Sequence, residues 1–322
     1  MRDSPELTWL RLSRLPGIGP KTLWSLHQAA SAGSVAVPDL LQASNPPRSA
    51  QPLLGKLKGM LEQQEADRVA EELDALCARR VALLHPDAPC CPSGVLAHGA
   101  ELGIPPVLFT RGHLPIACTR SVAVVGSRNV EEDGLEFADR LASELAASGL
   151  NVVSGYARGV DATAHAGALR AGGTTTMVLA LGILNFEARS ELKPLFSATN
   201  SLIVSQFHPR ARWMARQAMA RNKLVCAMSG VLVVVASGPE RDGQGRHSGT
   251  FDAAKTALAM GLPVLVLSPR ALRNPPLGNA VLLREGAREL FPEHAAEQVI
   301  EAASAMAGIA PRPAMPGQYA MF

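Results

Sequence analysis

The feature that most constrains the fold is a series of short apolar segments, separated by longer amphipathic stretches, that begins at Ser121. The expected strands cover residues 122–125, 152–154, 175–181, 202–205, 231–236 and 264–267. The expected helices cover residues 131–147, 161–169, 212–228 and 250–260. Apolar strands without polar alternation are typical of a parallel sheet covered on both faces. The sequence therefore predicts an α/β domain, an extended Rossmann-like doubly wound parallel sheet, over residues 121–292.

Three further regions surround this domain. Residues 1–80 have helical periodicity and predict a small helical domain of the helix-hairpin-helix or SAM-like kind. Residues 81–120 are rich in Pro and Gly and predict a linker with an edge strand near 107–109. Residues 293–322 predict a C-terminal helix and a flexible tail, without the pattern of a winged-helix domain.

The composition limits the class of protein. The formal net charge is only +3, so a nucleic-acid site requires local clustering of Arg and Lys. Aromatic residues make up 4% of the chain, which argues against a surface that binds mainly through many stacked rings. No secretory leader is apparent, and no apolar run reaches the roughly 18 residues that a membrane span needs. We expect a cytoplasmic protein without a membrane segment.

The cysteines predict neither disulfides nor a metal site. The chain has 5 of them without paired spacing, which favours a reducing compartment. Cys77, His85, Cys90 and Cys91 form the only metal-like grouping, and its spacing fits no known ligand pattern. No cofactor is expected either, because no G-x-G-x-x-G fingerprint follows the first strand.

Ligands of open parallel sheets bind at the carboxyl ends of the strands, so the residues after each strand are the candidates. Glycines there let a backbone approach a phosphate, hydroxyls donate to it, and arginines bind it with a forked guanidinium. After the first strand the candidates are Gly126, Ser127 and Arg128. After the second they are Ser154, Gly155, Arg158, Gly159 and Asp161, with His165 one turn along the next helix. For Asp161 and His165, a helix cap and a packed residue remain equal alternatives to ligand contact.

A long basic segment follows. Between Glu191 and Glu240 there is no acidic residue, and the cations are Lys193, Arg210, Arg212, Arg216, Arg221 and Lys223. Cations of one sign without counter-charges are typical of a phosphate-binding surface. On a helix, Arg212, Arg216 and Lys223 share one face, while Arg221 points the opposite way, toward the sheet. We predict a phosphate track that includes Arg221, Asn222 and Lys223.

A glycine-rich loop, residues 238–249, follows the strand 231–236. It leads into a helix that opens with Ser248, Gly249 and Thr250. Free amides and hydroxyls at a helix start are suited to an anion, so these three residues complete the predicted phosphate site.

Together these loops resemble the DprA/Smf DNA-processing family. The matching stretches are VAVVGSRNVEEDG, VVSGYARGVDATAHAGAL, ARNKLVCAMS, SGTFDAAKTAL and GNAVLLREGA, within about residues 106–290. The resemblance implies a Rossmann domain that binds single-stranded DNA, forms homodimers and loads a RecA-type recombinase onto DNA during transformation. It also implies that Arg128, Arg221 and Asn222 lie in the nucleic-acid pocket.

The chain departs from the family pattern in three places. Residues 218–220 read Ala-Met-Ala where the family has a proline-aromatic stretch, and the acidic residue that the family usually has after the strand ending at Ser237 is missing. The 238–249 loop is longer than usual. These departures weaken the expectation of RecA loading more than that of DNA binding.

The N-terminal Leu15-Pro16-Gly17-Ile18-Gly19-Pro20-Lys21 resembles a helix-hairpin-helix turn. In such a turn the glycine amides and a nearby lysine contact a DNA phosphate without reading sequence. Gly17, Gly19 and Lys21 are therefore candidate DNA contacts, and a turn that needs glycine for steric reasons alone is the alternative.

Two other functions share this architecture. The lonely-guy phosphoribohydrolases carry a catalytic Glu in a loop that matches residues 249–253, where this chain has Ala253, with Asp252 displaced by one. We therefore expect no catalytic residues, and hydrolysis of nucleotides is disfavoured. A sensor of a small nucleotide is the third alternative.

The C-terminal Gln318-Tyr319-Ala320-Met321-Phe322 resembles the short peptide with which bacterial polymerases and repair proteins bind the sliding clamp. Gln318, Met321 and Phe322 match that pattern. A clamp is therefore a candidate partner, and folding of these side chains onto the core is the alternative.

Overall fold

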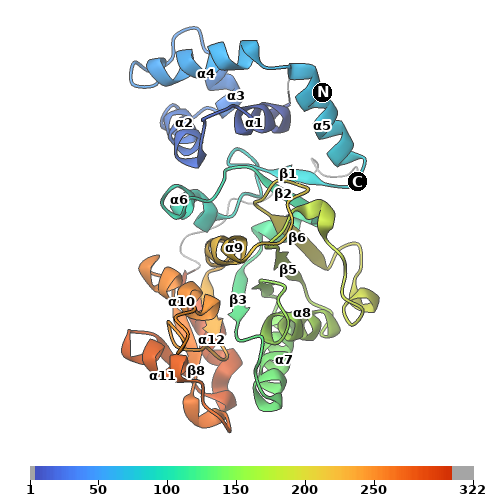
Figure 1. Ribbon diagram of the computed structural model, residues 1–322, viewed down its shortest axis with the longest axis vertical. Coiled ribbons are helices and arrows are strands. Elements are labelled where there is room, and N and C mark those ends of the chain that lie inside the picture. The colour runs from blue at the N-terminus through green and yellow to red at the C-terminus, as the bar shows by residue number, and fades with distance from the viewer. Residues whose placement is uncertain (1–3, 307–322) are drawn as a thin grey trace.

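A mixed sheet forms the centre of the computed structural model, which describes residues 4–306 (Figure 1). Its strand order within these residues is β1-β2-β6-β5-β4-β3-β7-β8-β9. The strands are β1 (Ala82–Leu84), β2 (Leu108–Gly112), β3 (Ser121–Val125), β4 (Asn151–Ser154), β5 (Thr175–Val178), β6 (Ser201–Ser205), β7 (Val231–Val234), β8 (Val264–Leu267) and β9 (Arg288–Leu290).

Seven neighbouring strands of this order, β6-β5-β4-β3-β7-β8-β9, are parallel. At one side of the sheet β2 is antiparallel to both β6 and β1. The first parallel strand, β3, pairs with β4 on one side and with β7 on the other. From β3 the chain adds β4, β5 and β6 on one side of the sheet and then crosses back to β7 on the other side of β3, so the topological switch point lies between the carboxyl ends of β3 and β7. The predicted doubly wound α/β fold is confirmed.

Helices cover both faces of the sheet. Val122 and Val124 of β3 pack in one core cluster with α7 (Glu132–Ala147), α8 (Val160–Arg170) and α12 (Ala295–Ala305). The alternate residues Ala123 and Val125 pack in another cluster with α9 (Ala215–Ala227), α10 (Gly249–Ala259) and α11 (Leu277–Arg284). This alternation follows from the two-residue period of a strand, and it explains why β3 is apolar from Val122 to Val125.

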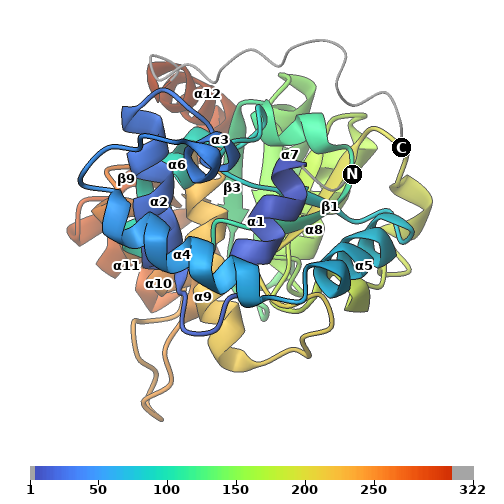
Figure 2. The same ribbon diagram turned by 90° about the horizontal axis from the view of Figure 1, so that it is seen from above.

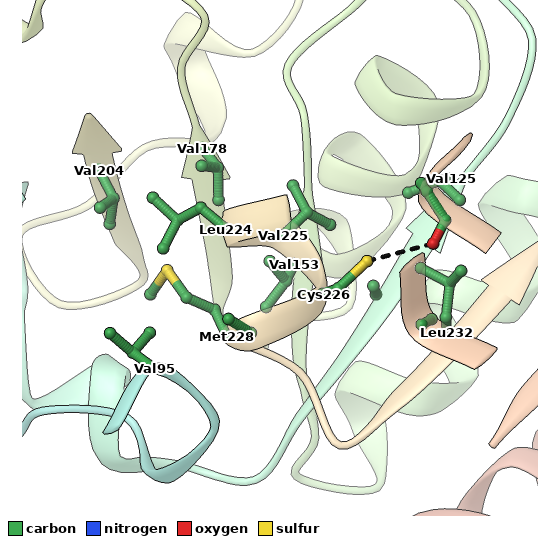
Figure 3. Close-up of a cluster of buried hydrophobic side chains, with 14 of the residues drawn as sticks. Val95, Val125, Val153, Val178, Val204, Leu224, Val225, Cys226, Met228 and Leu232 are labelled. Carbon is green, nitrogen blue, oxygen red and sulfur yellow. Dashed lines mark hydrogen bonds between the residues drawn. The ribbon is translucent and has the colours of Figure 1, made fainter. Parts of the chain in front are cut away.

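The position of α9 fixes much of the site. Figure 3 shows Leu224, Val225 and Met228 of this region packed among valines from β3, β4, β5, β6 and α6 (Ser93–Leu102). The Cys226 thiol donates a hydrogen bond of 3.3 Å to the Ala253 carbonyl, which joins α9 to α10. Because this end of α9 is buried, the helix is held at a fixed height above the sheet.

A layer of helices lies at the N-terminal end of the molecule, drawn in blue in Figures 1 and 2. They are α1 (Pro5–Ser13), α2 (Pro20–Ala32), α3 (Val37–Gln42), α4 (Gln51–Gln63) and α5 (Ala66–Cys77). Two buried tryptophans join this layer to the rest. The Trp24 indole donates to the Ile104 carbonyl at 2.8 Å, and the Trp9 indole donates to the Asp87 carboxylate at 2.8 Å.

Residues 81–120 form more structure than a linker. Both β1 and β2 extend the sheet beyond β6, and α6 packs against α9 so closely that a β-carbon at Gly94 would lie 2.4 Å from the Ala227 carbonyl oxygen. The sequence placed an edge strand near 107–109, and the observed strand is Leu108–Gly112. In the described part of the chain, none of the helices is both long and apolar enough to cross a membrane.

Candidate nucleic-acid interface

The loop after β3 presents a free arginine at the switch point. The Ser127 amide donates to the Ala236 carbonyl at 2.8 Å, which ties this loop to the end of β7. The Ser127 hydroxyl bonds the backbone of Asn129 in both directions at 3.1 Å. Arg128 is exposed and has no hydrogen bond or ion pair with any described residue. Its guanidinium is therefore available to an anionic ligand.

The loop after β4 packs directly on this first loop. Gly159 has φ 77°, a left-handed conformation that favours glycine, and it precedes α8. A β-carbon at Gly159 would lie 2.5 Å from the Ser127 carbonyl oxygen, and one at Gly126 would lie 2.5 Å from Val160. The two loops thus need both glycines in order to meet. Arg158 is exposed beside this contact.

Asp161 lies inside the site rather than on its surface. It is 5% exposed and accepts a hydrogen bond from the Ala157 amide at 3.3 Å, so it fastens the preceding loop. Gly159, not Asp161, is the N-cap of α8. Burial raises the pKa of Asp161, and the positive charge of Arg221 opposes that rise. The helix-cap alternative for Asp161 is therefore wrong: its carboxylate bonds the loop before α8 from inside the protein.

His165 is also enclosed. Its Nδ1 lies 2.7 Å from the Thr175 hydroxyl, which donates its own proton to the Val152 carbonyl at 2.7 Å. Nδ1 must therefore be the donor to Thr175. Burial, reinforced by Arg221 and Arg189, lowers the pKa of His165 to about 3. With no exposed surface, the neutral ring supports the loop from below, as the packed-residue alternative predicted. Ser154 is likewise buried, and its hydroxyl donates to the Val124 carbonyl at 2.6 Å.

Arg221 occupies the centre of the site. It is 5% exposed, and its Nη1 donates to the Val178 carbonyl at 2.9 Å. A β-carbon at Gly155 would lie 1.9 Å from that same nitrogen, so the loop after β4 rests on the guanidinium. Burial lowers the pKa of Arg221, Asp161 opposes this, and the nearby Arg128 adds to it. The inward direction expected from the helix geometry agrees with the structure, and the buried position makes Arg221 a support for the loops.

The next two residues of α9 point to different elements. The Asn222 amide donates to the Gly249 carbonyl at 2.9 Å, which holds the start of α10. Lys223 instead directs its Nζ to the Leu102 carbonyl at the end of α6, at 3.4 Å. The structure thus places the Lys223 amine beside a neighbouring helix, and its place in the phosphate track stays a prediction.

The start of α10 lies beside the loops after β3, β4 and β7. Ser248 caps this helix by accepting a hydrogen bond from the Phe251 amide at 3.3 Å, and Gly249 and Thr250 are partly exposed beside it. A β-carbon at Gly238 would lie 3.9 Å from the Ser248 hydroxyl, so both ends of the 238–249 loop meet. The loops after β3, β4 and β7 and the start of α10 form one continuous surface.

Asn279, a residue that the sequence analysis did not single out, supports this surface. It is fully buried at the start of α11. Its side chain accepts from the Ser237 amide at 2.8 Å and donates to the Val235 and Leu267 carbonyls at 3.0 Å each. It thereby joins the carboxyl ends of β7 and β8. The only signal in the sequence was its place in the GNAVLLREGA stretch.

Tyr156 is a second such residue, with a left-handed φ of 59°. Its hydroxyl accepts from the Arg189 amide at 2.8 Å and donates to the Glu187 carbonyl at 3.0 Å. The Arg189 guanidinium lies 5.1 Å from the ring centroid. These contacts attach the segment after β5 to the loop after β4. A groove of about 410 Å³ runs beside them along α8, lined by Arg158, Arg170 and Arg189 among others.

At the position that corresponds to the catalytic glutamate of the lonely-guy phosphoribohydrolases, this chain has Ala253 and no acidic residue. Ala253 is 2% exposed and packs in the core under α10. Asp252 is half-buried, and burial raises its pKa against the opposing charges of Lys223 and His247. Among the described residues, no group of His, Cys, Asp and Glu side chains is arranged to hold a metal ion.

The predicted helix-hairpin-helix turn joins α1 to α2. Gly17 has φ 70°, which explains this glycine by conformation. Gly19 precedes α2 in an extended conformation, and a β-carbon there would meet nothing within 4 Å. Packing therefore does not require glycine at position 19. Lys21 is exposed. The clamp-like residues Gln318, Met321 and Phe322 lie outside the described residues.

Comparison with solved structures identifies the fold. DNA processing protein A of Streptococcus pneumoniae superimposes with a TM-score of 0.67 at 21% identity, over 92% of this chain and 96% of that one. DNA processing protein A of Helicobacter pylori, described for its single-stranded DNA binding mode, gives a TM-score of 0.55 at 26% identity, over 69% of this chain and 96% of that one.

Sequence comparison identifies the family. The chain is 30% identical over 264 residues to a putative DNA processing protein DprA of Mycobacterium tuberculosis, covering 78% of this chain and 66% of the relative. It is 28% identical over 200 residues to DprA of Bacillus subtilis, covering 61% of this chain and 64% of the relative. It thus spans just under two thirds of these relatives. A family model for DNA recombination-mediator protein A matches residues 95–304. The chain therefore belongs to the DNA recombination-mediator protein A family, which comprises the DprA/Smf DNA-processing proteins.

Proposed function

We propose that this chain is a cytoplasmic single-stranded DNA-binding protein whose ligand lies along the carboxyl edge of the sheet. The observation that carries the proposal is the placement of exposed Arg128 and Arg158 on two interlocked loops above buried Arg221. Exposed guanidinium groups without partners are suited to phosphates, and the buried one fixes the loops that present them. The DNA-binding relative from Helicobacter pylori supports the choice of ligand.

The role is binding rather than catalysis in this proposal. The buried Ala253 leaves no carboxylate where a phosphoribohydrolase requires one, and the titratable groups inside the site, Asp161 and His165, are enclosed by protein. Because these two side chains are buried beneath the loops, they cannot contact the reacting bond of a bound substrate.

The experiment compares ligands on the whole chain by fluorescence anisotropy at several salt concentrations. A single-stranded oligonucleotide should bind tighter than a duplex of the same length, with an affinity that falls as salt rises. Nucleoside monophosphates should neither compete at millimolar concentration nor be hydrolysed. Tight binding of a mononucleotide with no binding of the oligonucleotide would indicate a nucleotide sensor, and release of free base would indicate a hydrolase.

The family resemblance extends the proposal to a homodimer that delivers the bound strand to a RecA-type recombinase. Sedimentation of the purified chain tests the first part. RecA filament formation on DNA coated with single-strand-binding protein, with and without this chain, tests the second. Equal filament rates in both reactions would remove the recombinase from the proposal.

The C-terminal peptide gives a separate proposal, a sliding clamp as partner. A fluorescent peptide of residues 311–322 should bind the clamp, and the double variant Gln318→Ala, Phe322→Ala should not. Equal binding by both peptides would exclude this partner.

A further inference from the structure

The segment that connects β6 to α9 lies at the same carboxyl edge and has no role in the site described so far. It is held to the segment after β5 by backbone hydrogen bonds from Gly182 to Ala211 at 2.8 Å and from Leu184 to Pro209 at 3.0 Å. The Asn185 amide also donates to the Ala211 carbonyl at 2.9 Å. In Figure 2 this segment and the loop before α10 project from the same side of the molecule. The end of the segment and the first residues of α9, residues 212–216 together, are exposed throughout.

Trp213 is the unusual residue of this segment. It is 52% exposed, whereas Trp9 and Trp24 are 0% and 2% exposed. No described residue makes a hydrogen bond or ring contact with Trp213, and the adjacent Met214 is 41% exposed. A tryptophan that folding leaves in water loses the stabilisation that burial provides for a large ring. Such an exposed ring on an anchored segment is typical of a binding contact.

The charges around this ring favour an anionic ligand. Arg210, Arg212 and Arg216 are exposed, and none has an ion pair or a side-chain hydrogen bond within residues 4–306. The first turn of α9 carries no acidic residue, and its N-cap Met214 provides no side-chain hydrogen bond. Cations near a helix N-terminus are unfavourable for the helix itself, because they face the positive end of its dipole. Folding therefore gives no reason for these arginines.

An aromatic face between unpaired guanidinium groups matches the chemistry of a single-stranded nucleic acid, whose bases are free to stack while its phosphates bind cations. We propose that Trp213 is a base-stacking platform that extends the single-stranded DNA site beyond β6, with Arg212 and Arg216 on the flanking phosphates. This inference rests on the proposed function and adds a contact that recognises bases rather than phosphates. A duplex cannot use it, because its bases are already stacked on one another.

The experiment compares the full chain with Trp213→Ala and Trp213→Phe on two ligands, an oligothymidylate and an abasic oligonucleotide of the same length. Trp213→Ala should weaken oligothymidylate binding about 5- to 150-fold, the range measured for loss of one stacked base. Trp213→Phe should retain most of the affinity. The abasic strand should bind the full chain and Trp213→Ala equally, because it keeps the phosphates and lacks the rings.

Tryptophan fluorescence provides a second readout. Because Trp9 and Trp24 are buried, quenching of the full chain by oligothymidylate reports on Trp213, and Trp213→Phe should lose that quenching. Unchanged oligothymidylate affinity in Trp213→Ala, or an equal loss on both strands, would overturn the stacking role. So would quenching by phosphatidylglycerol vesicles in place of the oligonucleotide, since it would indicate a membrane contact. If the full chain binds no oligothymidylate at all, the proposed function itself fails.

Discussion

Gly155 faces Arg221 so closely that a β-carbon on residue 155 would lie 1.9 Å from the guanidinium Nη1. That nitrogen already donates to the Val178 carbonyl at 2.9 Å, and the side chain is 5% exposed, so it has little room to move. The loop after β4 and the arginine of α9 therefore fix one another. The shape of the proposed DNA-binding surface therefore depends on Arg221, although Arg221 is itself almost completely buried.

Gly155→Ala should consequently displace Arg221 and disturb the loop that carries Arg158. We expect a loss of about 1–3 kcal/mol in the free energy of unfolding, the usual range for forcing an extra group into a packed interior. Chemical denaturation measures it. Gly243→Ala is the matched control, since a β-carbon there meets nothing within 4 Å. Equal free energies of unfolding for the two variants would show that the Arg221 side chain moves aside without loss of stability.

Arg221 also compensates the buried charge of Asp161. Arg221→Met should destabilise the chain near neutral pH, because it removes the positive charge that opposes the raised pKa of the buried Asp161 carboxyl. Burial already raises the pKa of Asp161, and the variant should raise it further. Stability lost to a raised carboxylate pKa returns as pH falls and the group takes up its proton, so the deficit should shrink toward pH 4.

The double variant Asp161→Asn, Arg221→Met is the control for this pair. It removes both charges, so its loss should be smaller than the sum of the two single losses. Denaturation of all four proteins at pH 7 measures the difference. Strictly additive losses would contradict an interaction between the two side chains.

His165 should make the fold sensitive to mild acid. Burial lowers its pKa from 6.5 to about 3, so the unfolded chain binds a proton in this range that the folded chain does not. The stability that His165 contributes is fully present above pH 6.5 and is lost as pH falls toward 3. Relative to His165→Asn, the full chain should lose about 1.4 kcal/mol per pH unit within that window.

The comparison variant His294→Asn changes an exposed histidine, with 70% of its side chain accessible. The difference between this variant and the full chain is the baseline against which the His165→Asn difference is compared. A constant difference between the full chain and His165→Asn from pH 7 to 4 would show that the buried ring titrates normally.

The helix-hairpin-helix proposal has a test that separates binding from packing. Space is open around Gly19, but this residue is the N-cap of α2, where glycine is preferred over alanine, so Gly19→Ala should cost about 1 kcal/mol in the free energy of unfolding. If the amides after residue 18 contact a phosphate, the added methyl should weaken DNA binding severalfold, and so should Lys21→Ala. DNA affinities equal to that of the full chain in both variants would leave the turn with a purely structural role.

The sequence predicted the parallel sheet because the central residues of β3, β4 and β7 are apolar without polar alternation, and these strands alternate with helical segments. It did not predict β1 and β9, which have three residues each and carry too few side chains to show a period. It treated the surroundings of β1 as a linker, since the pairing of β1 with β2 depends on residues far apart in the chain.

The site shows the same division. Glycines and arginines after strands pointed to loops that the structure brings together at one edge of the sheet, and helix geometry correctly turned Arg221 inward. Helix geometry also grouped Lys223 with Arg212 and Arg216. In the structure α6 lies beside α9, and the Lys223 amine donates a hydrogen bond to the Leu102 carbonyl of α6. Asn279 and Tyr156 were missed because their roles depend on backbone atoms of other segments, such as the Val235 and Leu267 carbonyls for Asn279. Pattern alone cannot locate such partners.

The most direct test of single-stranded DNA binding at the switch point is the salt dependence of oligonucleotide affinity in Arg128→Ala. Arg128 is exposed and unpaired within residues 4–306, so its removal should leave the fold intact. Arg68→Ala, on the outer surface of α5, is the matched control. Arg128→Ala should weaken binding at low salt and reduce the slope of log affinity against log salt by about one unit, whereas Arg68→Ala should change neither. An affinity and slope for Arg128→Ala equal to those of the full chain would contradict the placement of the DNA at this edge.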